Sequence, residues 1–177
     1  SGEILLKPGR RLELADIGLL ASVGRRRVPA SQKPRVAIVA TGDELTTVEQ
    51  APGSHQIRNS NSYTLYAQAL AAGAEPVLLG TARDNLSDLR KKIGQALQFD
   101  VAIISGGVSM GKYDLVEDVF DEFGVHVEFD AVAMKPGKPT VFGTAGSAMV
   151  FGLPGNPLDR KSTRLNSSHG YISYAVF

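Results

Sequence analysis

The chain has 177 residues, 43% of them hydrophobic, which is enough for one α/β domain with its own core plus a smaller segment. Its 19 basic and 18 acidic side chains leave a net charge of +1, which excludes the strongly basic surface expected of a protein that binds nucleic acid or a membrane. The absence of cysteine excludes disulfides and thiolate metal sites. We therefore expect a small-molecule ligand and, since no signal peptide is visible, a cytoplasmic location.

Residues 1–32 are predicted to be the remainder of a preceding domain together with a linker. Ala15 and Asp16 signal the beginning of a short helix that ends at Gly24, as helices often do. Three consecutive arginines and Pro29 follow, a composition typical of a solvated connector. Because this segment is too small to stand alone and begins in mid-pattern, we expect the chain to be a fragment of a longer protein.

Residues 33–158 are predicted to form the main domain, of the α/β class. Strands buried on both faces are expected at residues 35–40, 76–80 and 101–104, and helices at residues 63–72, 86–97 and from 114 onward. Three such units in succession predict a mostly parallel, doubly wound sheet in a three-layer arrangement, and hairpin-like spacing after Gly124 predicts antiparallel strands at a mixed edge. Residues 46–58, which contain Pro52 and Gly53, are expected to be a mobile loop.

Polar side chains come directly after the carboxyl ends of the predicted strands. Open α/β sheets bind their ligands at this edge. Asp43 and Glu44 come just after the first strand, and Asp84 holds the same place after the second. These side chains are candidates for binding a metal ion or polar groups of a substrate. The open alternative is that they serve only as a turn residue and a solvated acid. Asn61 could reach the same edge from the beginning of the first helix of this domain, where a simple capping role is equally open.

The third strand leads into a glycine-rich loop, Ser-Gly-Gly-Val-Ser-Met-Gly at residues 105–111, and then into a helix. Because Gly106 and Gly107 lack Cβ, their backbone amides can approach an anion, which the following helix N-terminus also favours. Further along, Pro139 stiffens a turn that carries Lys135 and Lys138, so these ammonium groups could bind an oxyanion or could simply be solvated. Another rigid loop follows the last predicted strand and contains Pro154, Gly155 and Asn156.

Five motifs give this chain a family resemblance. TGDEL, IRNSNSY, SGGVSMGKYD, MKPGKPTVFG and GLPGNP, in this order, resemble the pterin-binding domain of the MoeA-type molybdopterin molybdenumtransferases, which include the E domain of gephyrin. The similarity extends over residues 34–157 and implies a fold of the molybdopterin-binding-domain type. The same domain occurs in molybdopterin adenylyltransferases and in CinA-like proteins. The LKPGRRL and ADIGLL segments resemble the sequence that precedes the domain in MoeA proteins, which favours the transferase.

The resemblance implies an enzyme of molybdenum cofactor biosynthesis. Such an enzyme takes adenylated molybdopterin and molybdate, releases AMP with Mg²⁺, and leaves molybdenum on the dithiolene sulfurs of the pterin. The family also implies a homodimeric parent protein and a possible contact with the adenylyltransferase of the same pathway. Magnesium prefers one or two carboxylates together with phosphate oxygens, which this chain and such a substrate could supply.

Roles for individual residues are carried over from the family motifs. The catalytic residues implied are Asp43, Glu44, Asp84 and Asp114, of which Glu44 and Asp114 would bind the metal. Molybdate would meet the pterin beside Lys135, Lys138 and Pro139. Molybdopterin and its phosphate would bind at Asn61, Gly106, Gly107, Ser109, Pro154, Gly155 and Asn156.

This chain departs from the family pattern at two places. Asn59 stands where many members carry an acid, and residues 159–177 have the composition of a translated cloning adaptor and are expected to be non-native. The resemblance also implies a dimer whose active site is completed by an amino-terminal domain of the partner subunit, of which this chain has almost nothing. We therefore expect the isolated chain to be inactive and at most to bind the pterin. Three alternatives stay open: an adenylyltransferase, a pterin-binding or scaffold module without catalysis, and a truncated chain that is not stable.

Overall fold

The computed structural model describes residues 4–107, 115–133 and 139–155. The chain divides into two compact units, residues 1–32 and residues 33–177. Within the described ranges, no helix is long and apolar enough to cross a membrane.

The first unit contains one described helix, α1 (Leu14–Ser22). A capping box stabilises its first turn, since the carboxylate of Asp16 accepts a hydrogen bond of 3.0 Å from the backbone N–H of Glu13. Arg10 also binds Asp16, and this guanidinium holds the pKa of the Asp16 carboxyl below its ordinary value. The helix ends before Gly24, whose positive φ of 73° fits the predicted glycine stop.

The second unit is built on a six-stranded sheet with the strand order β4-β1-β5-β8-β7-β6. Neighbours among β4, β1, β5 and β8 are parallel, whereas β7 is antiparallel to both β8 and β6. The mostly parallel sheet with a mixed edge is therefore confirmed. The strands are β1 (Arg35–Thr41), β4 (Glu75–Ala82), β5 (Val101–Ser105), β6 (His126–Phe129), β7 (Val141–Ala145) and β8 (Ala148–Leu153).

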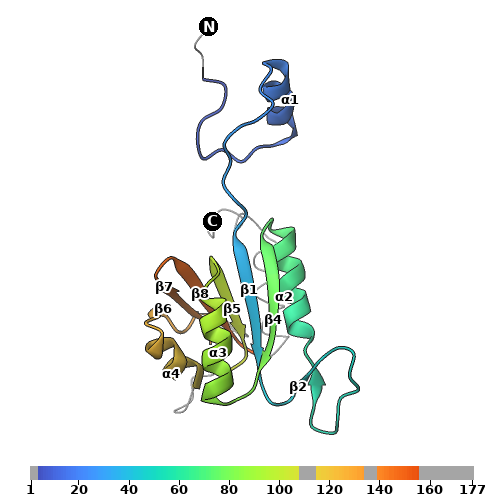
Figure 1. Ribbon diagram of the computed structural model, residues 1–177, viewed down its shortest axis with the longest axis vertical. Coiled ribbons are helices and arrows are strands. Elements are labelled where there is room, and N and C mark those ends of the chain that lie inside the picture. The colour runs from blue at the N-terminus through green and yellow to red at the C-terminus, as the bar shows by residue number, and fades with distance from the viewer. Residues whose placement is uncertain (1–3, 108–114, 134–138, 156–177) are drawn as a thin grey trace. The chain divides into compact units, whose positions relative to one another are not determined.

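Helices cover both faces of this sheet, as Figure 1 shows for α2 on one side of the strands and α3 on the other. Asn59 caps α2 and Asn85 caps α3, each accepting a hydrogen bond from the backbone N–H three residues ahead. This arrangement confirms the three-layer, doubly wound fold. The helices are α2 (Ser60–Ala71), α3 (Leu86–Ala96) and α4 (Leu115–Glu122).

The side chains of β1 point alternately to the two faces of the sheet and so belong to two separate parts of the core. Val36 and Ile38 pack with Leu65 of α2, whereas Ala37 and Val39 pack with residues of α3 and α4. Residues 36–40 are 3% exposed or less, so β1 is buried on both faces, as its apolar run predicts. The side with α3 and α4 holds the larger cluster of fully buried residues.

Two sequence predictions in this unit were wrong in detail. β4 is an edge strand with an alternating, half-buried pattern, and its edge position explains why Pro76 is tolerated there. Residues 46–58, predicted as one loop, contain the ends of a small parallel sheet of β2 (Leu45–Thr46) and β3 (Ile57–Arg58). Such short strands leave no periodic signal in the sequence.

The pairing of β1 with β4 contains a bulge. Ile38 lies opposite Leu78 and Val39 lies opposite Gly80, so Leu79 is an extra residue in β4. Gly80 has a positive φ of 85°, and the backbone carbonyl of Leu79 accepts a hydrogen bond from the Lys92 ammonium of α3. Lys92 therefore compensates the irregular backbone of the bulge.

An ion pair joins α3 to α4 and makes the packing of these helices sensitive to acid. Arg90 donates two hydrogen bonds of 2.6 Å to the carboxylate of Glu122, which hold the pKa of Glu122 below its ordinary value. The pair therefore stabilises the fold above the ordinary glutamate pKa of about 4.3 and loses this effect as the pH falls further. The wild-type Tm should exceed that of Glu122→Gln at pH 7, and the difference should vanish toward pH 3. Glu117→Gln, on the same helix, is the control, and a pH-independent difference would contradict the assignment.

Candidate functional site

The parallel strands bring their carboxyl ends to one edge of the sheet. From β1 the chain passes through α2 to β4 on one side, and from β4 it passes through α3 to β5 on the other side of β1. The strand order therefore reverses between β1 and β5, which is where open α/β sheets bind ligands. Thr41 ends β1 and Gly106 follows β5 at this switch point.

The glycine pair after β5 is closely packed on the end of β1. Gly106 has φ 99° and Gly107 has φ 64°, conformations that favour glycine. A Cβ added to Gly106 would lie 2.6 Å from the carbonyl oxygen of Thr41, and one added to Gly107 would lie 2.7 Å from the Thr41 hydroxyl. The backbone N–H of Gly106 donates to the carbonyl of Leu153 at 2.9 Å. Both glycines are thus required by the packing, and their phosphate-binding role stays a prediction.

Asn61 connects α2 to the loop after β8. Its side-chain Nδ2 donates a hydrogen bond of 2.7 Å to the carbonyl of Gly155. A Cβ added to Gly155 would lie 3.6 Å from the Cα of Gly106, so the two loops are in close contact. Three segments that are distant in sequence, containing Asn61, Gly106 and Gly155, therefore meet at this edge, and a binding role for them stays a prediction.

Asp43 and Asp84 hold the exits of β1 and β4 together. The backbone N–H of Asp43 donates to the Asp84 carboxylate, and the N–H of Asp84 donates to the Asp43 carboxylate, each at 3.3 Å. Glu44 folds back instead, with its carboxylate oxygens 2.5 and 2.7 Å from the position that a Cβ on Gly42 would take. Among the residues that the structure describes, no three acidic or histidine side chains converge on a metal position.

The other predicted site residues either lie near the same edge of the sheet or fall outside the described residues. Pro154 directly follows β8, and Pro139 precedes β7, whose first residue pairs with Gly152 near the same edge. Their proximity to the edge fits a site role without testing it. The remaining candidates lie outside the described residues: Ser109, Asp114, Lys135, Lys138 and Asn156.

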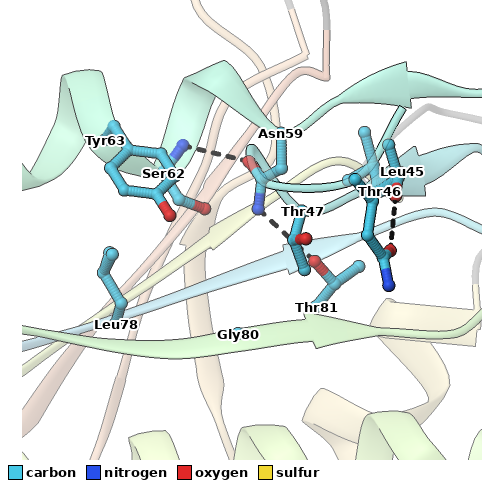
Figure 2. A pocket seen from close by; sticks show the side chains of 10 residues that line it. Leu45, Thr46, Thr47, Asn59, Ser62, Tyr63, Leu78, Gly80 and Thr81 are labelled. Carbon is cyan, nitrogen blue, oxygen red and sulfur yellow. Dashed lines mark hydrogen bonds between the residues drawn. The ribbon is translucent and has the colours of Figure 1, made fainter. Parts of the chain in front are cut away.

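A cavity of about 360 Å³ lies between the beginning of α2 and the end of β4 (Figure 2). Asn59 and Ser62 contribute from α2, while Leu78, Gly80 and Thr81 contribute from β4. Leu45, Thr46, Thr47 and Gln50 come from β2 and the loop after it. Sequence reasoning missed this cavity because it depends on β2, although the serine three residues after the Asn59 cap was visible as a signal.

Comparison with known proteins identifies the family to which this chain belongs. Residues 37–165 match the family described as a probable molybdopterin binding domain, which is more than half of the chain. The chain belongs to this molybdopterin-binding domain family. The fold of the molybdopterin-binding type is thereby confirmed, as is the resemblance that the five motifs predict.

Relatives of this chain include proteins named molybdopterin molybdenumtransferase. The one from Bacillus subtilis (strain 168) is 40% identical over 157 residues, which cover 88% of this chain and 36% of the relative. The one from Nostoc sp. (strain PCC 7120 / SAG 25.82 / UTEX 2576) is 40% identical over 161 residues, 89% of this chain and 37% of the relative. A molybdopterin biosynthesis MoeA protein from Pyrococcus horikosii has a similar crystal structure, with 35% identity, a TM-score of 0.74, and coverage of 87% of this chain and 38% of its own. The chain thus spans little more than a third of these relatives.

Because Gly107 is in close contact with Thr41, replacing it by alanine should lower the free energy of unfolding more than the same replacement at an open glycine position. Gly107 and Gly146 have similar positive φ values of 64° and 59°, but nothing lies within 4 Å of a Cβ added to Gly146. Gly146→Ala should therefore cost only about 1 kcal/mol of backbone strain, whereas Gly107→Ala should cost about 1–3 kcal/mol more because of overpacking. Urea denaturation measures the difference, and equal losses in the two variants would contradict the packing.

Proposed function

We propose that the protein to which this chain belongs is a molybdopterin molybdenumtransferase, and that this domain binds the pterin substrate at the switch point of the sheet. The observation that carries the proposal is the convergence of Asn61, Gly106, Gly155 and the Asp43–Asp84 pair on one edge. The names of the relatives support the reaction, the transfer of molybdate to adenylated molybdopterin with release of AMP. Catalysis is proposed for the whole protein, and the isolated chain is expected to bind substrate without turnover.

The phosphate of the substrate is proposed to bind beside the glycine pair. Gly107 is exposed and carries no side chain, so an anionic oxygen could approach its backbone closely, while the buried Gly106, whose N–H donates to the Leu153 carbonyl, holds the turn in place. Ser109, Asn156 and Pro154 are proposed to complete this part of the site, and Lys135, Lys138 and Pro139 to bind molybdate. Cationic groups held where negative charge develops would stabilise the transition state for AMP release.

Magnesium is proposed as the cofactor of the reaction. The carboxylates of Asp43 and Asp84 each accept a weak hydrogen bond of 3.3 Å from the backbone N–H of the other residue, and they accept no other from the part of the chain that the structure describes, so oxygen lone pairs remain for a cation. Magnesium binds through one or two carboxylates together with substrate phosphates, which fits this pair. Glu44 and Asp114 are proposed as further acidic ligands. The ion would neutralise charge on the phosphate oxygens when the substrate is bound.

Two alternatives are distinguished by simple assays. An adenylyltransferase would adenylate molybdopterin with ATP, whereas a scaffold module would bind a partner without turnover. A cytoplasmic location, a homodimeric parent and contact with the adenylyltransferase of the pathway are further expectations of the proposal. Size-exclusion chromatography of the full-length protein tests the dimer.

Pterin binding by this chain is the first test of the proposed function. Anaerobic titration should show that the wild-type chain binds molybdopterin, and that Asn61→Ala binds it about fivefold more weakly because the contact between α2 and the β8 loop is lost. Gln68→Ala, an exposed position on the same helix, should bind as the wild type does. A folded wild-type chain that binds no molybdopterin would refute the proposal.

The carboxylate pair is tested in the full-length protein. Asp84→Asn should lower molybdate-dependent release of AMP on the order of 100-fold, since a proposed ligand of the magnesium ion is lost. Asp118→Asn removes an exposed carboxylate of α4 and serves as the control. Activity of Asp84→Asn that matches the control would remove Asp84 from the catalytic residues.

A further inference from the structure

The cavity between α2 and β4 has a lining that is polar but uncharged. Its polar side-chain groups are hydroxyls and amides, and the described residues that line it include no lysine, arginine, aspartate or glutamate. Leu78 and Tyr63 add apolar surface of the kind that packs against a flat ring. Figure 2 shows Ser62 and Asn59 directed from α2 toward the strand that carries Thr81. A lining of this kind suits a neutral, hydrogen-bonding heterocycle better than an anion.

One of the hydroxyls in this cavity lacks a partner. Ser62 is 3% exposed, and its Oγ makes no hydrogen bond with any described residue, although its backbone N–H donates to the side-chain Oδ1 of Asn59 at 3.2 Å. The Asn59 amide reaches the Thr81 hydroxyl only at 3.4 Å, a weak contact. Buried polar groups are nearly always satisfied, so an orphaned hydroxyl in a cavity indicates a missing partner.

The cavity adjoins the edge that carries the proposed substrate site. Asn59 lies two residues before Asn61, and Thr81 lies three residues before Asp84, so the same segments line both places. A ligand whose anionic part occupies the glycine crevice could therefore extend an uncharged part into the cavity. The two regions differ in chemistry, because the exposed Gly107 presents backbone alone in one, whereas neutral side chains line most of the other.

We propose that this cavity binds the neutral heterocyclic ring of the substrate, with the Ser62 and Thr81 hydroxyls bonded to the ring edge. The inference rests on the proposed function, which supplies a ligand with anionic and heterocyclic parts. Adenylated molybdopterin carries two rings of this chemistry, the pterin and the adenine, both with hydrogen-bonding edges. Affinity measurements with each half of the ligand identify the ring.

The experiment compares matched variants of the 177-residue chain by isothermal titration with two probes, molybdopterin under anaerobic conditions and AMP. Ser62→Ala and Thr81→Val each remove one hydroxyl, and Ser87→Ala removes an exposed hydroxyl from the first turn of α3 as the control. Both cavity variants should bind one of the two probes about tenfold more weakly, while the control should not. The Tm of Ser62→Ala should equal or exceed that of the wild type, because an unpartnered hydroxyl is removed.

The outcomes separate this inference from the proposed function. Weaker binding of molybdopterin alone places the pterin ring in the cavity, and weaker binding of AMP alone places the adenine ring there. If the wild-type chain binds molybdopterin and both cavity variants bind the two probes unchanged, the inference is overturned and the proposed function stands. If the wild-type chain binds neither probe, both are overturned.

Discussion

The parallel pairing of β1 with both β4 and β5 is the constraint on which the rest of this molecule depends. β1 is buried on both faces and between two neighbours, so its backbone groups are satisfied within the sheet and its position is fixed. Because the chain leaves β1 toward one side and returns on the other, the ends of β1 and β5 form the crevice. Among the described residues, Asn61, Gly106 and Gly155 meet beside that crossing.

Much of the crevice is made of backbone. The Thr41 carbonyl lies against Gly106, the amides of Asp43 and Asp84 are bonded to each other's carboxylates, and Asn61 holds a carbonyl of the β8 loop. Such contacts join backbone groups of one loop to side chains or backbone of another and so fix the positions of the loops. A ligand that enters meets donors and acceptors whose geometry is already set, which lowers the entropy that binding would cost.

The sequence predicted the elements whose signal is local or periodic. The apolar run of β1 and the glycine turn after β5 each follow from side-chain chemistry at known spacings, whereas the cap of α2 is Asn59 and not Asn61, for which a capping role was left open. The edge position of β4, the β2–β3 pair and the cavity beneath it could not be predicted. These depend on which strands become neighbours, and tertiary pairing of two-residue strands leaves no period to detect.

The bulge in β4 also decides which face of the sheet each later residue of that strand occupies. Side chains alternate along a strand, so one extra residue inverts the alternation. Leu78 and Thr81 consequently line the same cavity although an odd number of positions separates them, while Ala82 packs in the core on the opposite side. Deleting Leu79 would remove the extra residue and still leave Thr81 opposite Ala40 and Ala82 opposite Thr41, so both side chains would keep their faces. An insertion or deletion elsewhere between Leu78 and Ala82 would place a different side chain in the bulge, where Gly80 supplies the positive φ of 85°.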